Sequence, residues 1–119
     1  MWNWWEKYQR EKLHEQLVTE LLAASHEAGL PSRDYANAQD MLSVGEYGCA
    51  FDIIVQQLYE HEVEISPNLF ALVDRVANSM LLNPECYFFL GELVRSPDNL
   101  CFLARKKLAI LLSSLLSPR

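Results

Sequence analysis

Histidines are the side chains in this chain best suited to acid–base chemistry or metal binding, and each of the three stands directly before a glutamate. This pairing, at His14, His26 and His61, suggests metal ligands. However, no HExxH pattern places two histidines on one helix face, and no glycine-rich loop has the spacing that holds a phosphate. The pattern therefore predicts histidines at the surface or at helix ends, in a protein that is not an enzyme and uses no metal or cofactor.

The cysteines, Cys49, Cys86 and Cys101, are three in number, far apart and flanked by apolar or aromatic residues. An odd number without a CxxC pair indicates neither a disulfide framework nor a zinc site. We expect small buried thiols in a reducing compartment.

The composition indicates a single folded domain over residues 1–119. Half of the residues are hydrophobic, and 16 acidic residues outnumber 10 basic ones, which gives a net charge of -6. Such a surface repels nucleic acid and anionic membranes, and it suits a basic protein partner, although solubility alone also explains the charge. The first residues show no secretory signal, and the apolar run at 108–116 is too short to cross a membrane, so we expect a cytoplasmic protein.

Apolar residues recur at helical spacing, and no segment alternates as a strand does. Gly29 followed by proline predicts a helix end, Ser32 predicts an N-cap, and three further N-cap residues are each followed by proline, at Ser66, Asn83 and Ser96. The predicted helices cover about residues 4–28, 32–44, 46–61, 67–82, 85–95 and 98–116. The sequence therefore predicts an all-α fold, a compact bundle of about six helices.

Two apolar segments near the chain ends allow two interpretations each. Trp2, Trp4, Trp5 and Tyr8 could anchor the protein at an interface, but aromatic residues at the start of an amphipathic helix commonly cover the end of a core, and we favour that role. The leucine-rich segment 98–116 could dimerise or lie on a membrane, and we favour a core helix.

Three acidic residues, Glu60, Glu62 and Glu64, fall at the end of the predicted helix over 46–61 and in the loop after it, where no lysine at helical spacing can neutralise them. Most charge runs are merely solvated, but binding residues concentrate on loops that a rigid scaffold positions. This segment is therefore the strongest local candidate for a binding site.

The centre of the chain resembles a known family. Residues 42–60 read LSVGEYGCAFDIIVQQLYE, a short acidic loop and a helix that begins at Ser66 follow, and residues 87–94 read YFFLGELV. This order is similar to that of the MafI-like immunity proteins of bacterial polymorphic toxin systems, which often have tryptophan near the position of Tyr87. The resemblance covers residues 42–95.

The resemblance implies a cytosolic antidote that binds a cognate toxin domain delivered by contact-dependent growth inhibition or a related system. We expect a monomer that binds the toxin in a 1:1 complex. Many such toxins are nucleases with a basic cleft, which an acidic binder can occupy. The toxin-binding residues that we predict are Glu46, Asp52, Tyr59, Glu60, Glu62 and Glu64. Tyr59 would act as an aromatic anchor, although its spacing from Val55 also permits burial. The alternative is a helical adaptor or regulator of another protein, homodimeric through segment 98–116.

Overall fold

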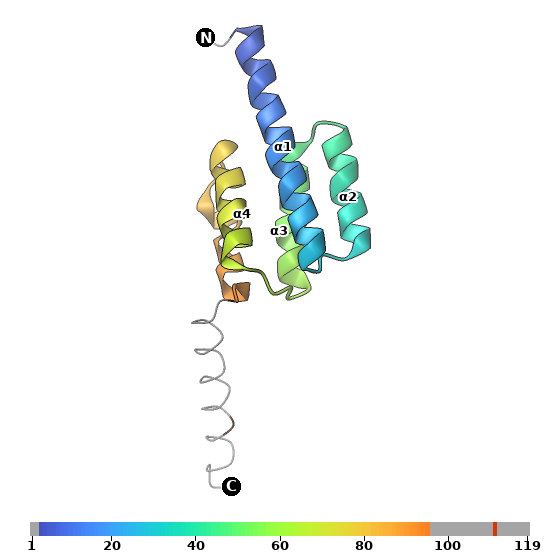
Figure 1. Ribbon diagram of the computed structural model, residues 1–119, viewed down its shortest axis with the longest axis vertical. Coiled ribbons are helices and arrows are strands. Elements are labelled where there is room, and N and C mark those ends of the chain that lie inside the picture. Colours follow the sequence, from blue (N-terminus) through green and yellow to red (C-terminus); the bar gives the residue numbers. More distant parts are fainter. Residues whose placement is uncertain (1–2, 96–110, 112–119) are drawn as a thin grey trace.

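Four α-helices and two short 3-10 helices make up most of the described part of the chain, residues 3–95 and residue 111 of a computed structural model (Figure 1). They are α1 (Trp4–Ala28), α2 (Ser32–Ser43), α3 (Tyr47–Glu60), α4 (Pro67–Ser79), η1 (Pro84–Cys86) and η2 (Phe88–Leu93). The all-α prediction is confirmed. The predicted helix over 98–116 lies outside the described residues except for Leu111, which is helical and exposed.

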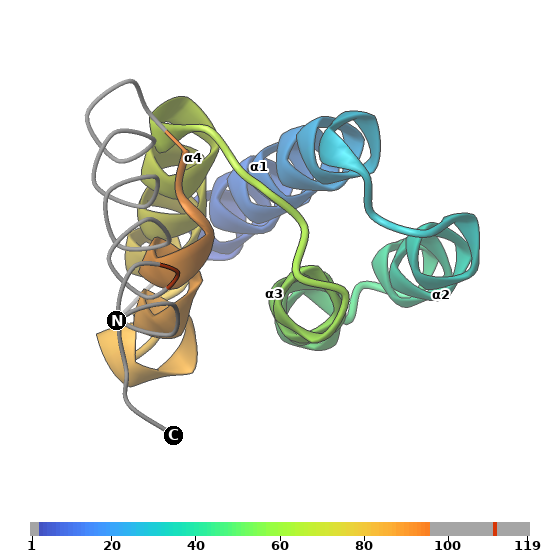
Figure 2. The same ribbon diagram turned by 90° about the horizontal axis from the view of Figure 1, so that it is seen from below.

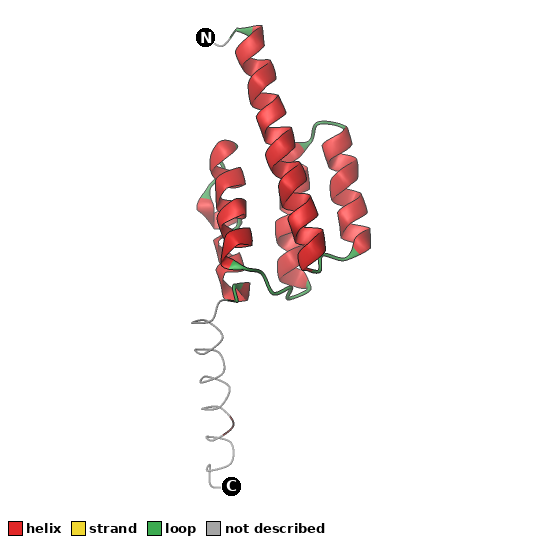
Figure 3. Cartoon of the chain, in the orientation of Figure 1, coloured by secondary structure: helices red, strands yellow, loops and turns green. Residues whose placement is uncertain are grey.

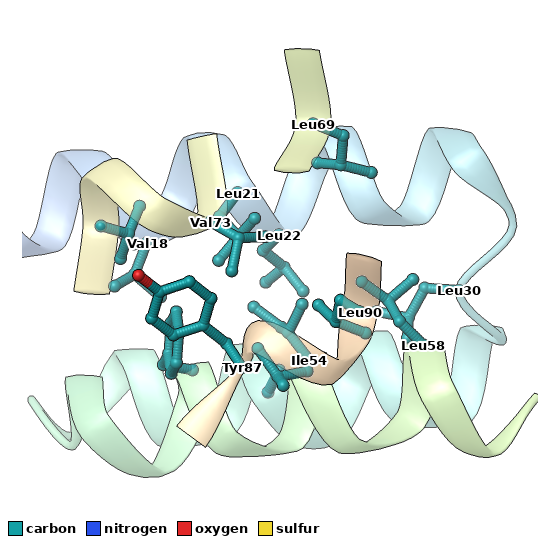
Figure 4. Packing of buried hydrophobic residues seen from close by; sticks show 14 of the residues in the cluster. Val18, Leu21, Leu22, Leu30, Ile54, Leu58, Leu69, Val73, Tyr87 and Leu90 are labelled. Atoms are coloured by element: carbon teal, nitrogen blue, oxygen red, sulfur yellow. The ribbon is translucent and has the colours of Figure 1, made fainter. Parts of the chain in front are cut away.

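Short loops reverse the chain between successive helices, so that α1 and α3 run antiparallel to α2 and α4 (Figures 1 and 3). Seen along the helix axes, α1 lies between α4 on one side and the α2–α3 pair on the other (Figure 2). The apolar stripes of α1, α3 and α4 meet around one core, which Tyr87 and Leu90 close from the η1–η2 segment (Figure 4).

Helix starts follow side-chain capping where the sequence provides a capping residue. The side chain of Ser66 accepts a hydrogen bond from the Leu69 amide at 3.0 Å, and that of Asn83 accepts one from the Glu85 amide, so both predicted N-caps are confirmed. The predicted N-cap at Ser32 is wrong, because this residue is already helical and Pro31 precedes it without a side-chain cap. The turn that ends α1 leads straight into α2.

All four α-helices end in the same kind of turn, in which one residue with positive φ reverses the chain. In α1 and α2 this residue is Gly29 and Gly45, which have no Cβ to oppose the conformation. In α3 and α4 it is Glu62 (φ 49°) and Leu81 (φ 57°). Because Leu81 reverses the chain, α4 ends before the predicted residue 82.

The segment predicted as one helix over 85–95 forms η1 and η2 instead. The backbone leaves the helical region at Tyr87, where φ is -146°, and the Tyr87 ring is buried against Phe51 and Phe70, with ring centroids 6.3 Å away in each case. The helix is interrupted here because the non-helical backbone at Tyr87 allows the ring to be buried in the core.

The prediction that the N-terminal aromatic residues cover a core is wrong for those that the structure describes. Trp4, Trp5 and Tyr8 are exposed, as is Leu13, and the first buried residue of α1 is Leu17. The N-terminal turns of α1 extend beyond the ends of the other helices (Figure 1).

The prediction of buried cysteines is also wrong for the two that are described. Cys49 and Cys86 are exposed free thiols, while Cys101 lies outside the described residues. Cys49 is on α3, where the next two residues, Ala50 and Phe51, take the positions that face the core.

Candidate functional site

An acidic hollow of about 570 Å³ lies where the end of α3 meets η2. Figure 1 shows these two elements at the lower end of the coloured ribbon. It is lined by Tyr59, Glu60, Glu62, Glu64, Glu92, Leu93 and Arg95. Four carboxylates and one guanidinium thus surround it, which gives the lining a formal charge of -3. We call this site the acidic hollow.

The turn after α3 sets the direction of two of these carboxylates. The Val63 amide donates to the Leu58 carbonyl at 3.0 Å, which fixes the reversal, and the chain then reaches the isolated β-bridge at Ile65. Val63 and Ile65 are buried in the core, while Glu62, in the turn, and Glu64, between the two buried residues, are exposed. The alternation of acidic and apolar residues in the sequence is therefore the signal of this half of the acidic hollow.

A short parallel pairing brings the other half of the acidic hollow into place. The Ile65 amide donates to the Leu93 carbonyl at 3.0 Å, and the Arg95 amide donates to the Ile65 carbonyl at 2.8 Å. This pairing sets the segment after η2 beside the acidic loop and brings Glu92 and Arg95 to it. Sequence reasoning missed these two residues because no local pattern reveals a contact between segments so far apart in the chain.

Tyr59 stands at the edge of the acidic hollow in a fixed orientation. Its hydroxyl donates to a carboxylate oxygen of Glu92 at 3.0 Å, and its ring meets the edge of Phe89, with 4.8 Å between centroids. The hydrogen bond to Glu92, together with the negative charge of that residue, raises the pKa of Tyr59 above 10. The residue is 40% exposed, so Val55 fills the core position and Tyr59 remains accessible.

A basic residue that is distant in the sequence, Arg95, lies beside the acidic loop. Its Nε lies 3.4 Å from Oε1 of Glu64, and its Nη1 donates to the Glu92 carbonyl at 3.5 Å. Glu60 belongs to the last turn of α3 and not to the loop. Within residues 3–95, no ion pair involves Glu60 or Glu62. These two carboxylates are therefore the ones most available to a cationic partner.

The other two predicted site residues lie elsewhere on α3. Asp52 is exposed two helical turns before Tyr59, about 10 Å along the axis and on the same face. Glu46 precedes the helix at its opposite end, where its carboxylate accepts a weak hydrogen bond from the Cys49 thiol at 4.0 Å. Four of the six predicted residues thus meet in the acidic hollow, Asp52 extends its surface along α3, and Glu46 does not reach it.

The acidic hollow offers hydrogen-bond acceptors and negative charge to a ligand. The nearby His61 is tied to another element, since its Nε2 lies 3.3 Å from Oδ2 of Asp34 in α2. In the part of the chain that the structure describes, no three His, Cys, Asp or Glu side chains are grouped to hold a metal ion. Lysine and arginine side chains are the groups that such a site pairs with best.

Comparison of the chain with models of protein families, with curated proteins and with solved structures finds no match. Among the described helices, none combines the length and the apolar character that crossing a membrane requires.

Proposed function

We propose that this chain is a cytoplasmic immunity protein that binds and neutralises a basic toxin domain of the nuclease type. The observation that carries the proposal is the acidic hollow, in which glutamates from two distant segments surround the accessible ring of Tyr59. Its lining residues all fall within residues 42–95, the part of the chain that resembles the MafI-like immunity proteins. The acidic site and the resemblance both support the proposal.

Charge complementarity explains how such a site would act. A nuclease cleft is basic because it must hold a phosphate backbone, and an acidic protein surface is attracted to it over long range. Long-range attraction accelerates the encounter and favours the correct orientation, while close contacts set the lifetime of the complex. Tyr59 supplies the rigid aromatic anchor, and Glu60 and Glu62 supply carboxylates for lysine or arginine side chains of the toxin.

The decisive experiment mixes the purified chain with the toxin product of the adjacent reading frame. We expect a stable 1:1 association of chain and toxin domain and loss of toxin activity. Raised salt should slow association more than it speeds dissociation, because ions screen the long-range attraction. If the toxin stays fully active in the presence of an excess of the folded chain, the proposal is wrong.

A matched pair of variants locates the binding site. Glu60, Glu62 and Glu92 are changed together to glutamine in one variant, and the exposed Glu20, Glu27 and Glu85 in the control. Both variants lose three negative charges, so a general charge effect weakens both equally. A site at the acidic hollow predicts that the first variant loses affinity by at least about tenfold more than the control. Equal losses would place the site elsewhere.

A further inference from the structure

A cluster of three aromatic rings extends from the end of the molecule opposite the acidic hollow. Trp4, Trp5 and Tyr8 are 76%, 54% and 44% exposed, on the part of α1 that passes beyond the other helices (Figure 1). The Tyr8 ring stacks on both indoles, with centroid distances of 5.9 and 5.8 Å. Single exposed apolar residues are common, but a contiguous group of large rings marks an interaction surface. We call this group the aromatic stripe.

The face of α1 that carries the aromatic stripe continues into charged residues. Helical spacing places Glu11 and Lys12 on the same face, one turn after Tyr8. A second hollow, of about 660 Å³, opens beside this face towards the turn between α2 and α3, and it is lined by Lys7, Arg10, Glu11, His14, Gly45 and Tyr47. The surface therefore consists of a protruding aromatic group and, next to it, a recess with charged walls.

We propose that a second copy of this chain covers the aromatic stripe, through antiparallel pairing of the two α1 ends about a two-fold axis beside Tyr8. In this arrangement Trp4 and Trp5 lie at the level of Lys12 and Glu11 of the partner subunit, next to that subunit's recess. An indole face attracts an ammonium group, and an indole N–H can donate to a carboxylate. The contact is isologous, because each copy offers the same rings and receives the partner's rings beside the same recess.

Charge balance favours a second copy over other occupants. The exposed start of α1 carries Glu6, Lys7, Arg10, Glu11 and Lys12, which sum to +1 in a chain of net charge -6. Two copies therefore approach through a region of mixed charge and not through the acidic surface of the chain. An anionic lipid surface would meet these carboxylates and the acidic remainder of the chain, which oppose it.

The available area suits a modest dimer. Aromatic side chains of about 150–250 Å² each, at the observed exposures, offer roughly 250–450 Å² per copy. The rings of both copies thus provide roughly 500–900 Å² of the roughly 1,200 Å² at the lower end of stable interfaces, and the charged residues beside them supply the remainder. The acidic hollow stays open at both far ends, so this dimer does not depend on the proposed toxin and does not compete with it.

The tryptophans make the interface directly observable. All three tryptophans of the chain, Trp2, Trp4 and Trp5, belong to this N-terminal segment, so intrinsic tryptophan fluorescence reports on it alone. We expect sedimentation equilibrium of the full chain to show a dimer in the micromolar range, and tryptophan emission to shift to shorter wavelength as the protein concentration rises.

Three variants of the full chain complete the test. Replacing Trp4, Trp5 and Tyr8 together by alanine should give a monomer with unchanged helical circular dichroism, since these residues lie outside the core. The control replaces the exposed Leu81 and Phe88 by alanine and should remain dimeric. Lys12→Glu keeps every ring and should raise the dimer dissociation constant about tenfold.

Several results would overturn the proposal. The wild-type chain could stay monomeric at every concentration, or the triple alanine variant could dimerise like the wild type, which would place the interface elsewhere. A monomer whose tryptophan emission shifts only with phosphatidylserine vesicles would assign the aromatic stripe to a lipid surface. A Lys12→Glu variant that dimerises with unchanged affinity would contradict the antiparallel arrangement.

Discussion

The Tyr59 hydroxyl and the Glu92 carboxylate meet at 3.0 Å and join α3 to η2 across the acidic hollow. Phe89 supports the same ring from its side, so Tyr59 holds one orientation before any partner arrives. An anchor that is already ordered loses little conformational entropy on binding. In the proposed complex, we therefore expect Glu92 to act mainly through the tyrosine that it orients.

Substitutions at Tyr59 should separate the contribution of the aromatic ring to toxin affinity from the contribution of its hydrogen bond. Tyr59→Phe keeps the ring and loses the bond, so toxin affinity should fall by less than about tenfold. Tyr59→Ala removes the anchor, so affinity should fall by about thirtyfold or more. Titration calorimetry measures both values, with thermal unfolding as the check on the fold. An equal loss in the two variants would mean that the ring itself contributes nothing.

Glycine at the two strained helix ends should stabilise the protein, and only one of these changes should affect binding. Glu62 and Leu81 both have positive φ, a conformation that costs a residue with a Cβ about 1 kcal/mol relative to glycine. Glu62→Gly and Leu81→Gly should each raise the free energy of unfolding by up to that amount in urea titrations. Glu62→Gly should weaken toxin binding, while Leu81→Gly should not. A Glu62→Gly variant that binds as tightly as the wild type would remove this carboxylate from the site.

The buried tyrosine should make stability depend on pH above 10. The hydrogen bond of Tyr87 to the Asp74 carboxylate, followed by burial, raises the pKa of Tyr87 from 10 to about 12. The folded state then holds the phenolic proton more tightly than the unfolded state. The stabilisation that protonated Tyr87 contributes to the folded state is therefore complete below pH 10 and is lost as the pH rises from 10 to about 12.

Comparison with Tyr87→Phe isolates this effect. The free energy of unfolding of the variant should be about 1–2 kcal/mol lower than that of the wild type at neutral pH. It should also fall less steeply between about pH 10 and 12. Urea unfolding of both proteins across this range provides the test. Parallel curves for the two proteins would show that the proton of Tyr87 plays no part.

Local chemistry explains which features the sequence could predict. The capping role of Ser66 depends on residues that follow it directly, so this N-cap can be predicted from the sequence. Glu62 and Glu64 alternate with apolar residues, which also reveals their outward direction. Glu92 and Arg95 join them only through the pairing of Ile65 with Val94, and that contact follows from the packing of the whole chain.

The exposure of the aromatic stripe was foreseeable by a different argument. Helix α1 has 25 residues, whereas α2, α3 and α4 have 12, 14 and 13. At 1.5 Å per residue, α1 exceeds each neighbour by about 16–20 Å, so short antiparallel helices cannot cover all of it. The prediction that these aromatic rings cover the end of a core was wrong because it rested on the residue types of Trp4 and Trp5. The lengths of the neighbouring helices were not part of it.

One buried hydroxyl offers a further route to stabilisation. The Ser25 side chain of α1 is fully buried, and its Oγ has no hydrogen-bond partner among the described residues. An unsatisfied buried hydroxyl costs about 1–3 kcal/mol, and alanine is also the better helix former. Ser25→Ala should therefore raise the free energy of unfolding by at least about 1 kcal/mol.

Thr19→Ala on the same helix is the matched control. The Thr19 hydroxyl is exposed and donates to the Glu15 carbonyl at 2.6 Å, so its removal changes helix propensity without relieving a buried polar group. The gain at Ser25 should exceed the gain at Thr19 in urea unfolding at neutral pH. If Ser25→Ala instead destabilises the protein, the hydroxyl must make a hydrogen bond in solution, and the core around α1 must hold a polar partner for it.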